Sequence, residues 1–401
     1  MRRAAIVAPA RTAVGGFGGV FRPLRAEDLA ARILEAVVSR SGIDPVVIED
    51  VVFAQSYSNS EAPCIGRWAA LHADLPLSVP GLQIDRRCGG GLQALITAAM
   101  MVQTEAADVV VAGGVESMSN IEHYTTSARW GQRSGNQSLY DRLDRGREMS
   151  QPAWRFGAIS GMVETAENLA NDYGIDREAA DAFAARSHYR AAAAQARGDF
   201  AAEIVAVEVP QRRGEPVIVD RDEGIRPHST VASLGALRPL IAGGTVTAGN
   251  SSQQNDAAAA CLVVAEDRLD ALGLEPMGFL ESWAAFGCDP ARMGIGPVPA
   301  VQKLFARTGL SFDDLDLIEV NEAFAVQVLA VLDGWKLEQA DVEDRLNVNG
   351  SGISLGHPIA ATGLRIMTTM LYELRRRGGG RALETMCIGG GQGLAAVFSA
   401  M

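Results

Sequence analysis

The chain of 401 residues predicts an α/β fold made of two similar halves, with a further domain inserted between them. Three short segments of the first third have counterparts, in the same order, in the last third. Residues 50–55 resemble 316–321, residues 88–92 resemble 350–353, and residues 111–115 resemble 387–391. Each pair is typical of strand, glycine turn and helix in an α/β unit, and so long a repeat is not a solenoid. We therefore predict a duplicated α/β half, with chance similarity among glycine-rich turns as the alternative.

The pattern of apolar residues predicts the strands and helices of each half. Residues 109–112 form a continuous apolar run that is typical of a buried parallel strand. Residues 89–102 carry apolar side chains at helical spacing, with few polar ones, which predicts a buried helix. We expect further strands at 82–85, 317–320 and 382–386, and a helix beginning near Val298.

The middle of the chain differs in composition from both halves. Residues 121–250 are rich in Arg, Ser, Asp and Glu, and an Ala-rich helix is expected from Arg177 to Arg197. A long surface excursion is one interpretation, but the length favours a separate lid or loop domain. We expect a first half at 1–120 with 251–272, the inserted domain at 121–250, and a second half at 273–401.

The bulk composition argues against several classes of protein. Hydrophobic residues make up 48% and charged residues 21%, as in ordinary globular proteins. The net charge of −12 argues against nucleic-acid binding, which needs a basic face. Apolar runs are too short for a membrane span or an export signal, so we expect a cytoplasmic protein without membrane insertion. Five cysteines without a CxxC pair indicate free thiols and no metal site.

One stretch could offer local positive charge to an anionic ligand. Residues 211–238 contain five arginines, but also four acidic residues. A solvated charged loop is the equal alternative for such a mixture.

Cys88 is the first candidate catalytic residue. It follows the expected strand at 82–85, precedes the buried helix, and is itself followed by three glycines. A thiol at a helix N-terminus is expected to favour the thiolate. We expect the glycines to let a substrate carbonyl approach the backbone, whose N–H groups could hold an oxyanion. The alternative is an inert buried cysteine.

Two further turns carry candidate residues. His357 is one of only five histidines and lies on a glycine-rich turn before Pro358, and imidazole is the natural base to activate a thiol. Cys387 follows the expected strand at 382–386 and precedes three glycines, and its thiol could act as acid or base at carbon. Asn321 could orient a water or an oxyanion, or be only a helix N-cap.

Together these segments resemble the signature blocks of the thiolase family. The blocks are Cys88 with its glycines, residues 321–324, residues 356–358 and residues 387–391, and the resemblance covers essentially the whole chain. It implies a layered α/β/α/β/α arrangement of duplicated thiolase-like halves with an inserted loop domain. It also implies cleavage of a 3-ketoacyl-CoA by free CoA, or the reverse condensation, by an acyltransferase that is typically a homodimer or homotetramer.

The resemblance also assigns roles to residues. Cys88 would carry the acyl group, His357 would activate it, and Cys387 would move a proton at the acetyl-CoA carbon. Asn321 would hold the water of one oxyanion site, and the backbone N–H groups of Cys88 and Gly389 would form another. CoA would be a co-substrate, and no metal or prosthetic group is implied. The positions that match CoA-contacting residues are Arg226, Ala248, Ser252, Met293, Ala323 and Phe324.

This chain departs from the common family pattern around the acyl and pantetheine walls. Gly90 replaces a serine, Arg87 stands where many relatives have glutamine, and residues 161–164 and 253–256 also differ. These changes leave the predicted catalytic residues in place. We therefore expect a degradative enzyme that acts on a longer, branched or cyclic 3-ketoacyl-CoA rather than acetoacetyl-CoA.

Three other functions stay open at this point. A condensing enzyme of the ketoacyl-synthase type has a Cys-His-His site, whereas Cys387 is a second cysteine. A non-catalytic CoA- or lipid-binding relative would lack at least one of Cys88, His357 and Cys387, and all three are present. A thiol-redox protein would need the two sulfurs within disulfide reach.

Overall fold

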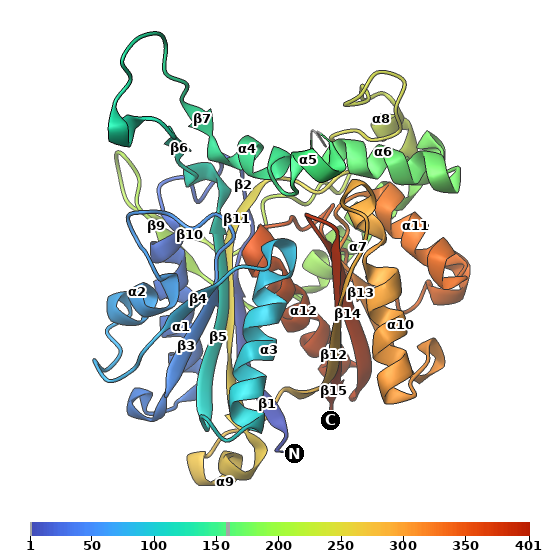
Figure 1. Ribbon diagram of the computed structural model, residues 1–401. Helices are drawn as coiled ribbons and strands as arrows, with labels where there is room; N and C mark the ends of the chain where they lie inside the picture. Colours follow the sequence, from blue (N-terminus) through green and yellow to red (C-terminus); the bar gives the residue numbers. More distant parts are fainter. Residues whose placement is uncertain (1, 158–160) are drawn as a thin grey trace.

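The computed structural model describes residues 2–157 and 161–401, and its halves share one strand order (Figure 1). The first half orders its strands β4-β3-β5-β11-β1, and the second orders its strands β13-β14-β15-β12. A parallel bridge from Ile318 to Leu346 takes the place of β4 in the second half. The predicted duplication is therefore confirmed. The strands are β1 (Ala4–Thr12), β3 (Asp50–Ala54), β4 (Leu82–Ile84), β5 (Val109–Ser117), β11 (Asn255–Ala265), β12 (Gly278–Gly287), β13 (Leu317–Val320), β14 (Gly380–Ile388) and β15 (Gln392–Ala400).

The two halves are joined through their first strands. Ala5 of β1 pairs with Phe279 of β12, and Ile6 pairs with Gly278, in an antiparallel contact of two residue pairs. Two short strands extend the first sheet, because β2 (Gly15–Gly16) pairs with β11 and β8 (Ile204–Val205) pairs with β1. The molecule is thus built around a seam at which equivalent strands of the halves meet.

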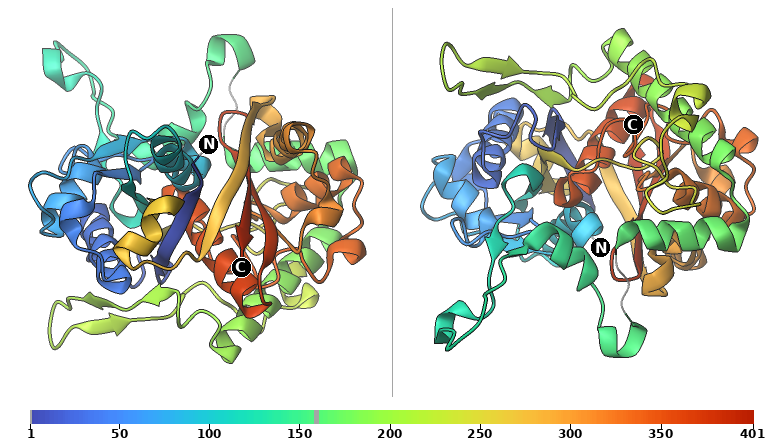
Figure 2. Two further views of the ribbon diagram at one scale, coloured as in Figure 1. Left: turned by 90° about the horizontal axis from the view of Figure 1, so that it is seen from below. Right: turned by 90° about the horizontal axis from the view of Figure 1, so that it is seen from above.

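Helices lie on both faces of each sheet, which gives the expected five layers (Figures 1 and 2). Two central helices pack against each other between the sheets, and each half has two outer helices. The central pair is α3 (Gly90–Gln103) and α12 (Thr362–Arg376), and the outer helices are α1 (Ala26–Ser41) and α2 (Ile65–His72) in the first half and α10 (Pro297–Thr308) and α11 (Ala325–Trp335) in the second. Helix α3 is apolar nearly all round because both of its faces are covered, whereas α12 also buries the polar side chains Arg365, Thr368 and Thr369.

A long excursion separates β5 from β11, two neighbouring strands of the first sheet. Its helix α7 (Arg177–Arg197) has the predicted bounds. An arm with β6 and β7 rises on one side of the molecule, and α8 rises on the other (Figure 1). The division of the chain at residues 120, 250 and 272 stays a prediction. The remaining elements are β6 (His123–Tyr124), β7 (Tyr140–Asp141), α4 (Arg142–Glu148), α5 (Ala153–Phe156), α6 (Met162–Tyr173), β9 (Val207–Val209), β10 (Val217–Val219), α8 (Val231–Gly235) and, after β11, α9 (Leu269–Leu272).

Two of the three predicted repeats are matched in the wrong register. Residues 350–353 are not the counterparts of 88–92, because Leu346 corresponds to Leu82 and Thr362 to Gly90. Val51 pairs with Val111 in the first half, and Leu317 pairs with Ala382 in the second. When residues 50–55 are aligned with 316–321, Val111 therefore corresponds to Ala382. Glu116, rather than Val111, is then equivalent to Cys387. The prediction correctly treated β5 and β14 as equivalent strands. Their register was wrong because the glycines used for the alignment lie before the strand end in one half and after it in the other.

In the described part of the chain, the apolar helices pack into the hydrophobic core. None of these helices combines the length and hydropathy needed to cross a bilayer.

Candidate active site

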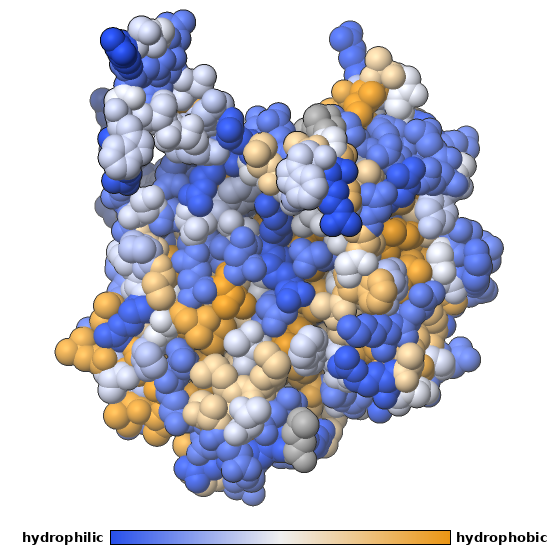
Figure 3. Space-filling view, in the orientation of Figure 1, coloured by the Kyte–Doolittle hydropathy of each residue, from blue (hydrophilic) through white to orange (hydrophobic). Residues whose placement is uncertain are grey.

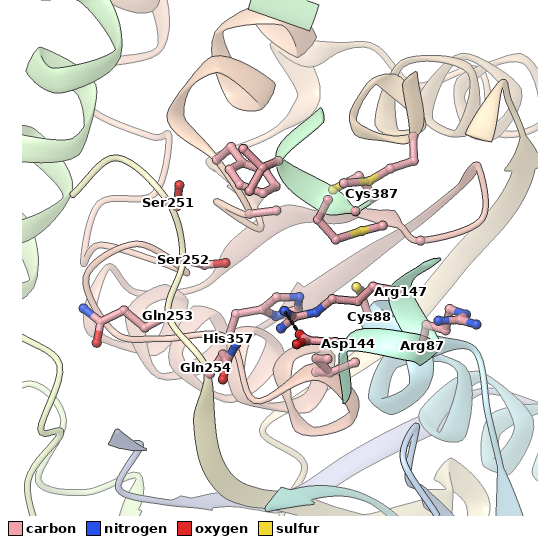
Figure 4. A pocket seen from close by; sticks show the side chains of 18 of the residues that line it. Arg87, Cys88, Asp144, Arg147, Ser251, Ser252, Gln253, Gln254, His357 and Cys387 are labelled. Carbon is pink, nitrogen blue, oxygen red and sulfur yellow. Dashed lines mark ion pairs between the residues drawn. The ribbon is translucent and has the colours of Figure 1, made fainter. Parts of the chain in front are cut away.

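Three residues that are far apart in the sequence line one cavity at the ends of the two sheets (Figure 4). Cys88 comes from the first half, and His357 and Cys387 come from the second half. Residues of the inserted region also line this cavity, namely Asp144, Arg147, Met162 and Leu240. Met118 and Ser251–Gln254, which flank the insertion, line it as well. The structure therefore brings together the two thiols and the imidazole that the sequence singled out.

Cys88 lies in a sharp turn between β4 and α3. The turn is a single 3-10 turn, Arg87–Gly89, and Arg87 adopts a left-handed backbone conformation with φ of 45°. Such a conformation is uncommon for a non-glycine residue, and it turns the chain abruptly before the helix. Cys88 is therefore held at the mouth of α3 by its backbone.

The glycines after Cys88 serve packing between the halves. A Cβ atom on Gly89 would lie 2.5 Å from Cδ1 of Ile388, and one on Gly91 would lie 2.7 Å from the carbonyl oxygen of Ala360. Neither distance leaves room for a side chain, so α3 can approach the second half only with glycine here. The expectation that these glycines let a substrate carbonyl approach the backbone stays a prediction.

Burial raises the pKa of the Cys88 thiol. The N–H of Gly389, hydrogen-bonded to the sulfur, and the nearby Arg87 guanidinium lower this pKa, but burial has the larger effect. From the helix N-terminus alone, we expected a lowered pKa and hence a thiolate. That expectation is wrong, because the pKa is raised. Because the resting group is a thiol, a neighbouring base must take its proton.

His357 is fixed by contacts at its backbone and at one ring nitrogen. Its backbone N–H donates to Oδ1 of Asn255 at 2.9 Å, and its Nδ1 lies 2.6 Å from Oγ1 of Thr362. Burial lowers the pKa of His357 to about 3, and the charges of Arg365 and Arg147 lower it further. The ring is therefore neutral near pH 7. With a proton on Nδ1, donated to Thr362, Nε2 is free to act as a base.

Cys387 lies one residue before the end of strand β14 and is almost fully buried. Burial raises its pKa well above the ordinary thiol value, and the nearby Cys88 and Cys288 sulfurs raise it further. Both thiols line the same cavity. A thiol with so high a pKa holds its proton until a strong base forms beside it, so it can act as an acid at carbon.

The turn after Cys387 puts a backbone donor next to Cys88. Gly390 and Gly391 have φ of 86° and 79°, which only glycine adopts readily, and they close the hairpin from β14 to β15. Gly389 lines the cavity, and a Cβ there would meet only Arg87 and Met162, at 3.6 and 3.7 Å. The expected Gly389 donor is thus beside the nucleophile.

Asn321 contacts the imidazole from below the cavity wall. It is fully buried, and its Nδ2 lies 3.5 Å from Nδ1 of His357. Its Oδ1 has no hydrogen-bond partner among the described residues. The N-cap interpretation is wrong, because α11 starts at Ala325 and Phe324 occupies the cap position. A buried amide with an unpartnered oxygen leaves a place for a water or a substrate oxygen.

The predicted CoA-contacting residues lie along one side of the site. Ser252, Met293, Ala323 and Phe324 line the catalytic cavity, and the N–H of Ser252 donates to the carbonyl of Ala323 at 2.9 Å. Ala248 and Arg226 line an adjoining cavity that shares Leu240 and Ser251–Gln254 with the first. A continuous path therefore leads from Arg226 on the surface to the thiols.

Glu322 and Arg147 were not interpreted from sequence. Glu322 is buried and accepts hydrogen bonds from Ser187 Oγ at 2.6 Å and Asn347 Nδ2 at 2.9 Å, which ties α7 to the second half. Arg147 comes from α4 and lines the catalytic cavity. Its neighbourhood in the sequence, with alternating arginine and acidic residues, resembles an ordinary charged surface helix, so no signal marked it. Among the described residues, no three His, Cys, Asp or Glu side chains could hold a metal ion together.

Comparison with known proteins finds the same family over the whole length. The family models for "Thiolase, N-terminal domain" and "Thiolase, C-terminal domain" match residues 4–267 and 274–400. An acetyl-CoA acetyltransferase of Chromobacterium violaceum is 43% identical over 395 residues, which cover 98% of each chain.

Solved structures of the same type superpose over the whole chain. The acetyl-CoA acetyltransferase of Bacillus anthracis has a TM-score of 0.95 and 38% identity, covering 100% of this chain and 99% of its own. Human mitochondrial 3-ketoacyl-CoA thiolase in complex with CoA has a TM-score of 0.92 and 36% identity, covering 100% of this chain and 98% of its own.

Proposed function

This chain belongs to the thiolase family, and from that premise we propose a reaction for the cavity. The protein is an acyltransferase that uses free CoA to cleave a 3-ketoacyl-CoA into acetyl-CoA, or another short acyl-CoA, and a shortened acyl-CoA. The same steps run in reverse as a Claisen condensation. The observation that carries the proposal is that Cys88, Cys387 and a neutral His357 line one cavity.

The first half-reaction breaks the carbon–carbon bond. Nε2 of His357 takes the proton of Cys88, and the thiolate attacks the 3-keto carbon. The bond between C2 and C3 then breaks, and its electron pair passes to C2, which takes the proton of Cys387. Acetyl-CoA leaves, and the remaining acyl group stays on Cys88 as a thioester.

The second half-reaction returns every group to its starting state. Free CoA gives its thiol proton to the Cys387 thiolate and attacks the acyl carbon on Cys88. The Cys88 sulfur leaves and takes back the proton held by His357. Covalent catalysis thus divides one difficult exchange into two easier steps.

Two groups of donors would stabilise the oxyanions of these steps. The N–H groups of Cys88 and Gly389 would hold the oxygen of the carbonyl attacked by Cys88, and Gly389 already bonds the Cys88 sulfur. His357 with a water on Asn321 would hold the enolate oxygen of acetyl-CoA, which accords with the unpartnered Oδ1 of Asn321. Fixed donors of this kind stabilise charge that develops in the transition state.

CoA would enter along the path from Arg226 to the thiols. The guanidinium of Arg226 would meet the nucleotide end, and Ala248, Ser252, Met293, Ala323 and Phe324 would surround the pantetheine arm. CoA acts here as a co-substrate, and the chemistry needs no prosthetic group.

The acyl substrate is proposed to be longer, branched or cyclic, and the direction degradative. Support comes from the cavity, which extends beyond Cys88 to Tyr57, Met118 and Ile359. The test compares thiolysis rates of acetoacetyl-CoA and longer 3-ketoacyl-CoAs, with mass spectrometry of the acyl group on Cys88. A clear preference for acetoacetyl-CoA would contradict the substrate proposal, and the absence of any acyl-Cys88 would contradict the reaction itself.

A homodimer or homotetramer is proposed for the assembly. Strand β4 is the open edge of the first sheet, and Leu71 and Leu77 beside it are exposed. Figure 3 shows hydrophobic side chains on this side of the molecule, over the region of α2 and β4. Trp130 and Leu139 on the arm are also exposed. Exposed apolar patches and open edges favour association, which light scattering would measure. The proposed compartment is the cytoplasm.

The rival functions make different predictions from the same cavity. A thiol-redox protein would form a bond between Cys88 and Cys387 and would show no acylation by acetyl-CoA. A binding-only relative would bind acyl-CoA without turnover. Stoichiometric acetylation of Cys88 separates the thiolase reaction from both.

A further inference from the structure

Glu116 is a buried carboxyl that the proposed reaction does not use. It is the second-last residue of β5 and is 1% exposed. Its Oε1 accepts the N–H of Tyr57 at 3.1 Å, and its Oε2 accepts the N–H groups of Ser56 at 3.2 Å and Ala360 at 3.3 Å. A buried carboxyl that bonds three backbone groups holds the segments to which they belong.

These three bonds join parts of the site that come from different halves of the molecule. Ser56 and Tyr57 follow strand β3 of the first half and line the catalytic cavity. Ala360 lies in the 3-10 turn η9 (Ile359–Ala361) of the second half, which begins two residues after His357. The carboxyl of the first half therefore holds the turn that follows the base of the second half.

Turn η9 also lies directly on the backbone of the first half. A Cβ atom on Gly114 of β5 would be 2.2 Å from the carbonyl oxygen of Ala360, and one on Gly91 of α3 would be 2.7 Å from it. Only glycine leaves room for so close an approach. The N–H and the carbonyl of Ala360 thus both contact the first half, and the segment after His357 is anchored there.

Tyr57 extends this link to the inserted region. Its hydroxyl donates to the carbonyl of Leu143 in α4 at 3.2 Å. Its side chain also packs with Met118 and Leu143, and Ile359 of η9 packs against this cluster. The two loops that Glu116 bonds therefore meet each other as well, beside the cavity that both of them line.

The ionisation of Glu116 changes near neutral pH. Burial raises the pKa of its carboxyl to about 7, against the opposing effect of the three N–H groups, and the charge of Asp85 raises it further. The carboxylate accepts at both oxygens, whereas the protonated form turns one oxygen into a donor that cannot accept an N–H in the same way. The anchor is therefore complete above pH 7 and weakens as the pH falls below 7.

The surroundings of Glu116 contain few other ionisable groups. Helix α3 and turn η9 have none, and Asp50 of β3 lies at the opposite end of that strand. Asp85 and Tyr57 are the loop residues whose charges are coupled to that of Glu116. The buried ionisable groups of the other elements packed against β5 bond elsewhere, namely Glu27 of α1, Asp256 of β11 and Arg365 of α12.

The catalytic groups themselves do not titrate near pH 7. The pKa of His357 is lowered to about 3, and the pKa values of the Cys88 and Cys387 thiols are raised. A loss of acylation between pH 8 and pH 5.5 therefore cannot come from protonation of the imidazole, and Glu116 is the adjoining group that changes charge in this range.

We propose that Glu116 is a positioning residue of the thiolase reaction, whose carboxylate anchors the turn after His357 and so holds the imidazole in place to take the proton of Cys88. The inference rests on the proposed reaction and adds a residue to its site. Glu116 touches neither the substrate nor the reacting atoms. Its protonation, rather than that of His357, then sets the acid limit of activity.

The test measures the single-turnover rate at which acetyl-CoA acetylates Cys88 between pH 5.5 and 8.5. This step consumes no free CoA, so the thiol of CoA as a reactant does not shape the profile. The wild-type rate is expected to fall about 10- to 30-fold from pH 8 to pH 5.5, with its midpoint near 7. Glu116→Gln is neutral at every pH, so it should show the low rate throughout, with the KM for acetyl-CoA within about twofold.

Glu116→Asp is the conservative variant. It keeps a carboxylate on a side chain one methylene shorter, so it should recover part of the rate at pH 8 and keep an acid limb. Circular dichroism checks the folding of both variants. If Glu116→Gln does not fold, the wild-type profile and the Asp variant decide the question, because a flat profile in either would contradict the role of Glu116.

Glu319→Gln is the matched control. Glu319 is also a buried carboxyl with a raised pKa, about 8, but it belongs to β13 and does not line the catalytic cavity. The control should keep both the wild-type rate at pH 8 and the acid limb near 7. Loss of the limb in this variant as well would mean that the limb does not report Glu116, and would overturn the inference.

The remaining outcomes separate this inference from the thiolase reaction. If the Glu116→Gln variant keeps the limb, or acetylates at the wild-type rate at pH 8, Glu116 is not a positioning residue and the reaction stands. If the variant raises KM and leaves the rate at saturation unchanged, Glu116 serves binding of acetyl-CoA, and the inference is again wrong. If wild-type Cys88 is not acetylated at any pH, both proposals fall.

Discussion

The two halves of the molecule share a sheet order but differ in the loop that leads to the central helix. In the first half, the chain goes from Leu82 of β4 to the start of α3 at Gly90 through one tight turn. In the second half, the corresponding connection runs from Leu346 to the start of α12 at Thr362, about twice as far. The added length reaches the cavity and carries His357. Duplication therefore supplied the scaffold, and one lengthened loop supplied the base.

The equivalent strand ends have also diverged. Glu116 of β5 is buried and accepts hydrogen bonds from the backbone N–H groups of Ser56, Tyr57 and Ala360. Cys387, at the equivalent position of β14, has an apolar setting and a raised pKa. One half uses the position to fix loops, and the other uses it for a reactive thiol.

The cores of the two sheets differ at a third equivalent pair. In the first half the ring of Phe53 packs directly against Gly113, where a Cβ atom would lie 2.0 Å from the ring. Glu319 and Glu384 occupy the matching positions of the second half, and both are buried. Burial raises the pKa of Glu319 to about 8 and that of Glu384 well above its usual value. At this pair of positions, the first half therefore has apolar residues and the second half has ionisable ones.

The largest effect is expected when the catalytic residue of the first half is removed. Cys88→Ala should abolish the acyl-enzyme and lower thiolysis by about 10⁴-fold or more, because the proposed acyl carrier is lost. Burst kinetics and mass spectrometry after mixing with acetyl-CoA would measure this. Cys64→Ala is the control, since Cys64 is an exposed free thiol outside the cavity. Persistent acylation of the Cys88 variant would contradict the assignment.

Removing the thiol of the second half should separate the two half-reactions. Cys387→Ala should still accept an acetyl group on Cys88, yet lower carbon–carbon cleavage by about 10²- to 10⁴-fold, because C2 has lost its proton donor. The measurement pairs acetyl labelling with a thiolysis assay. Cleavage of a 3-ketoacyl-CoA at the wild-type rate would remove Cys387 from the mechanism.

A smaller effect is expected from the residue that positions the base. Thr362→Val should lower kcat about tenfold with little change in KM, because the hydroxyl that holds Nδ1 of His357 is lost. Thr362→Ser should restore most of the rate. The pH profile is a second readout. Because the pKa of His357 is lowered to about 3, wild-type acylation should not fall through protonation of this ring between pH 5 and 7. In Thr362→Val the ring should be held less firmly and be better solvated, so its pKa should lie nearer to neutrality.

The smallest effect concerns stability rather than activity. Glu319 has a folded-state pKa of about 8, above its unfolded value of 4.5, so its contribution to folding is full below pH 4.5 and is lost as pH rises toward 8. Glu319→Gln should therefore raise the melting temperature by a few degrees at pH 8.5 and change it less at pH 5. Thermal unfolding at both pH values tests this, with Phe53→Leu as a pH-independent comparison in the other half. An equal shift at both pH values would mean that ionisation of Glu319 is not the cause.

Much of this architecture could be predicted because local patterns mark it. The buried strand at 109–112 and the helix from Arg177 to Arg197 were found from apolar runs and alanine content, and Cys88, His357 and Cys387 stood out on glycine-rich turns. What failed depends on three-dimensional neighbours. The register that makes Glu116 equivalent to Cys387 is set by strand pairing. The direction of the Cys88 pKa shift is set by burial that no local pattern shows.

Residues acting through distant contacts were missed for the same reason. Thr362 lies only five residues after His357, yet its contact with Nδ1 depends on how the loop meets α12. Arg147 belongs to a segment of mixed charge, and only the folded chain shows that this segment lines the cavity. A sequence shows which side chains could react, but not which of them share a cavity.

The position of β1 has a consequence for how the protein is made. Its long neighbours in the sheet are β11 and β12, which begin at Asn255 and Gly278. A ribosome therefore releases the first strand long before its partners exist, and such non-local pairing slows folding. Cys88 likewise emerges long before His357 and Gly389. The nascent polypeptide thus carries its nucleophile without its base, and reactivity arises only after both later residues have been made.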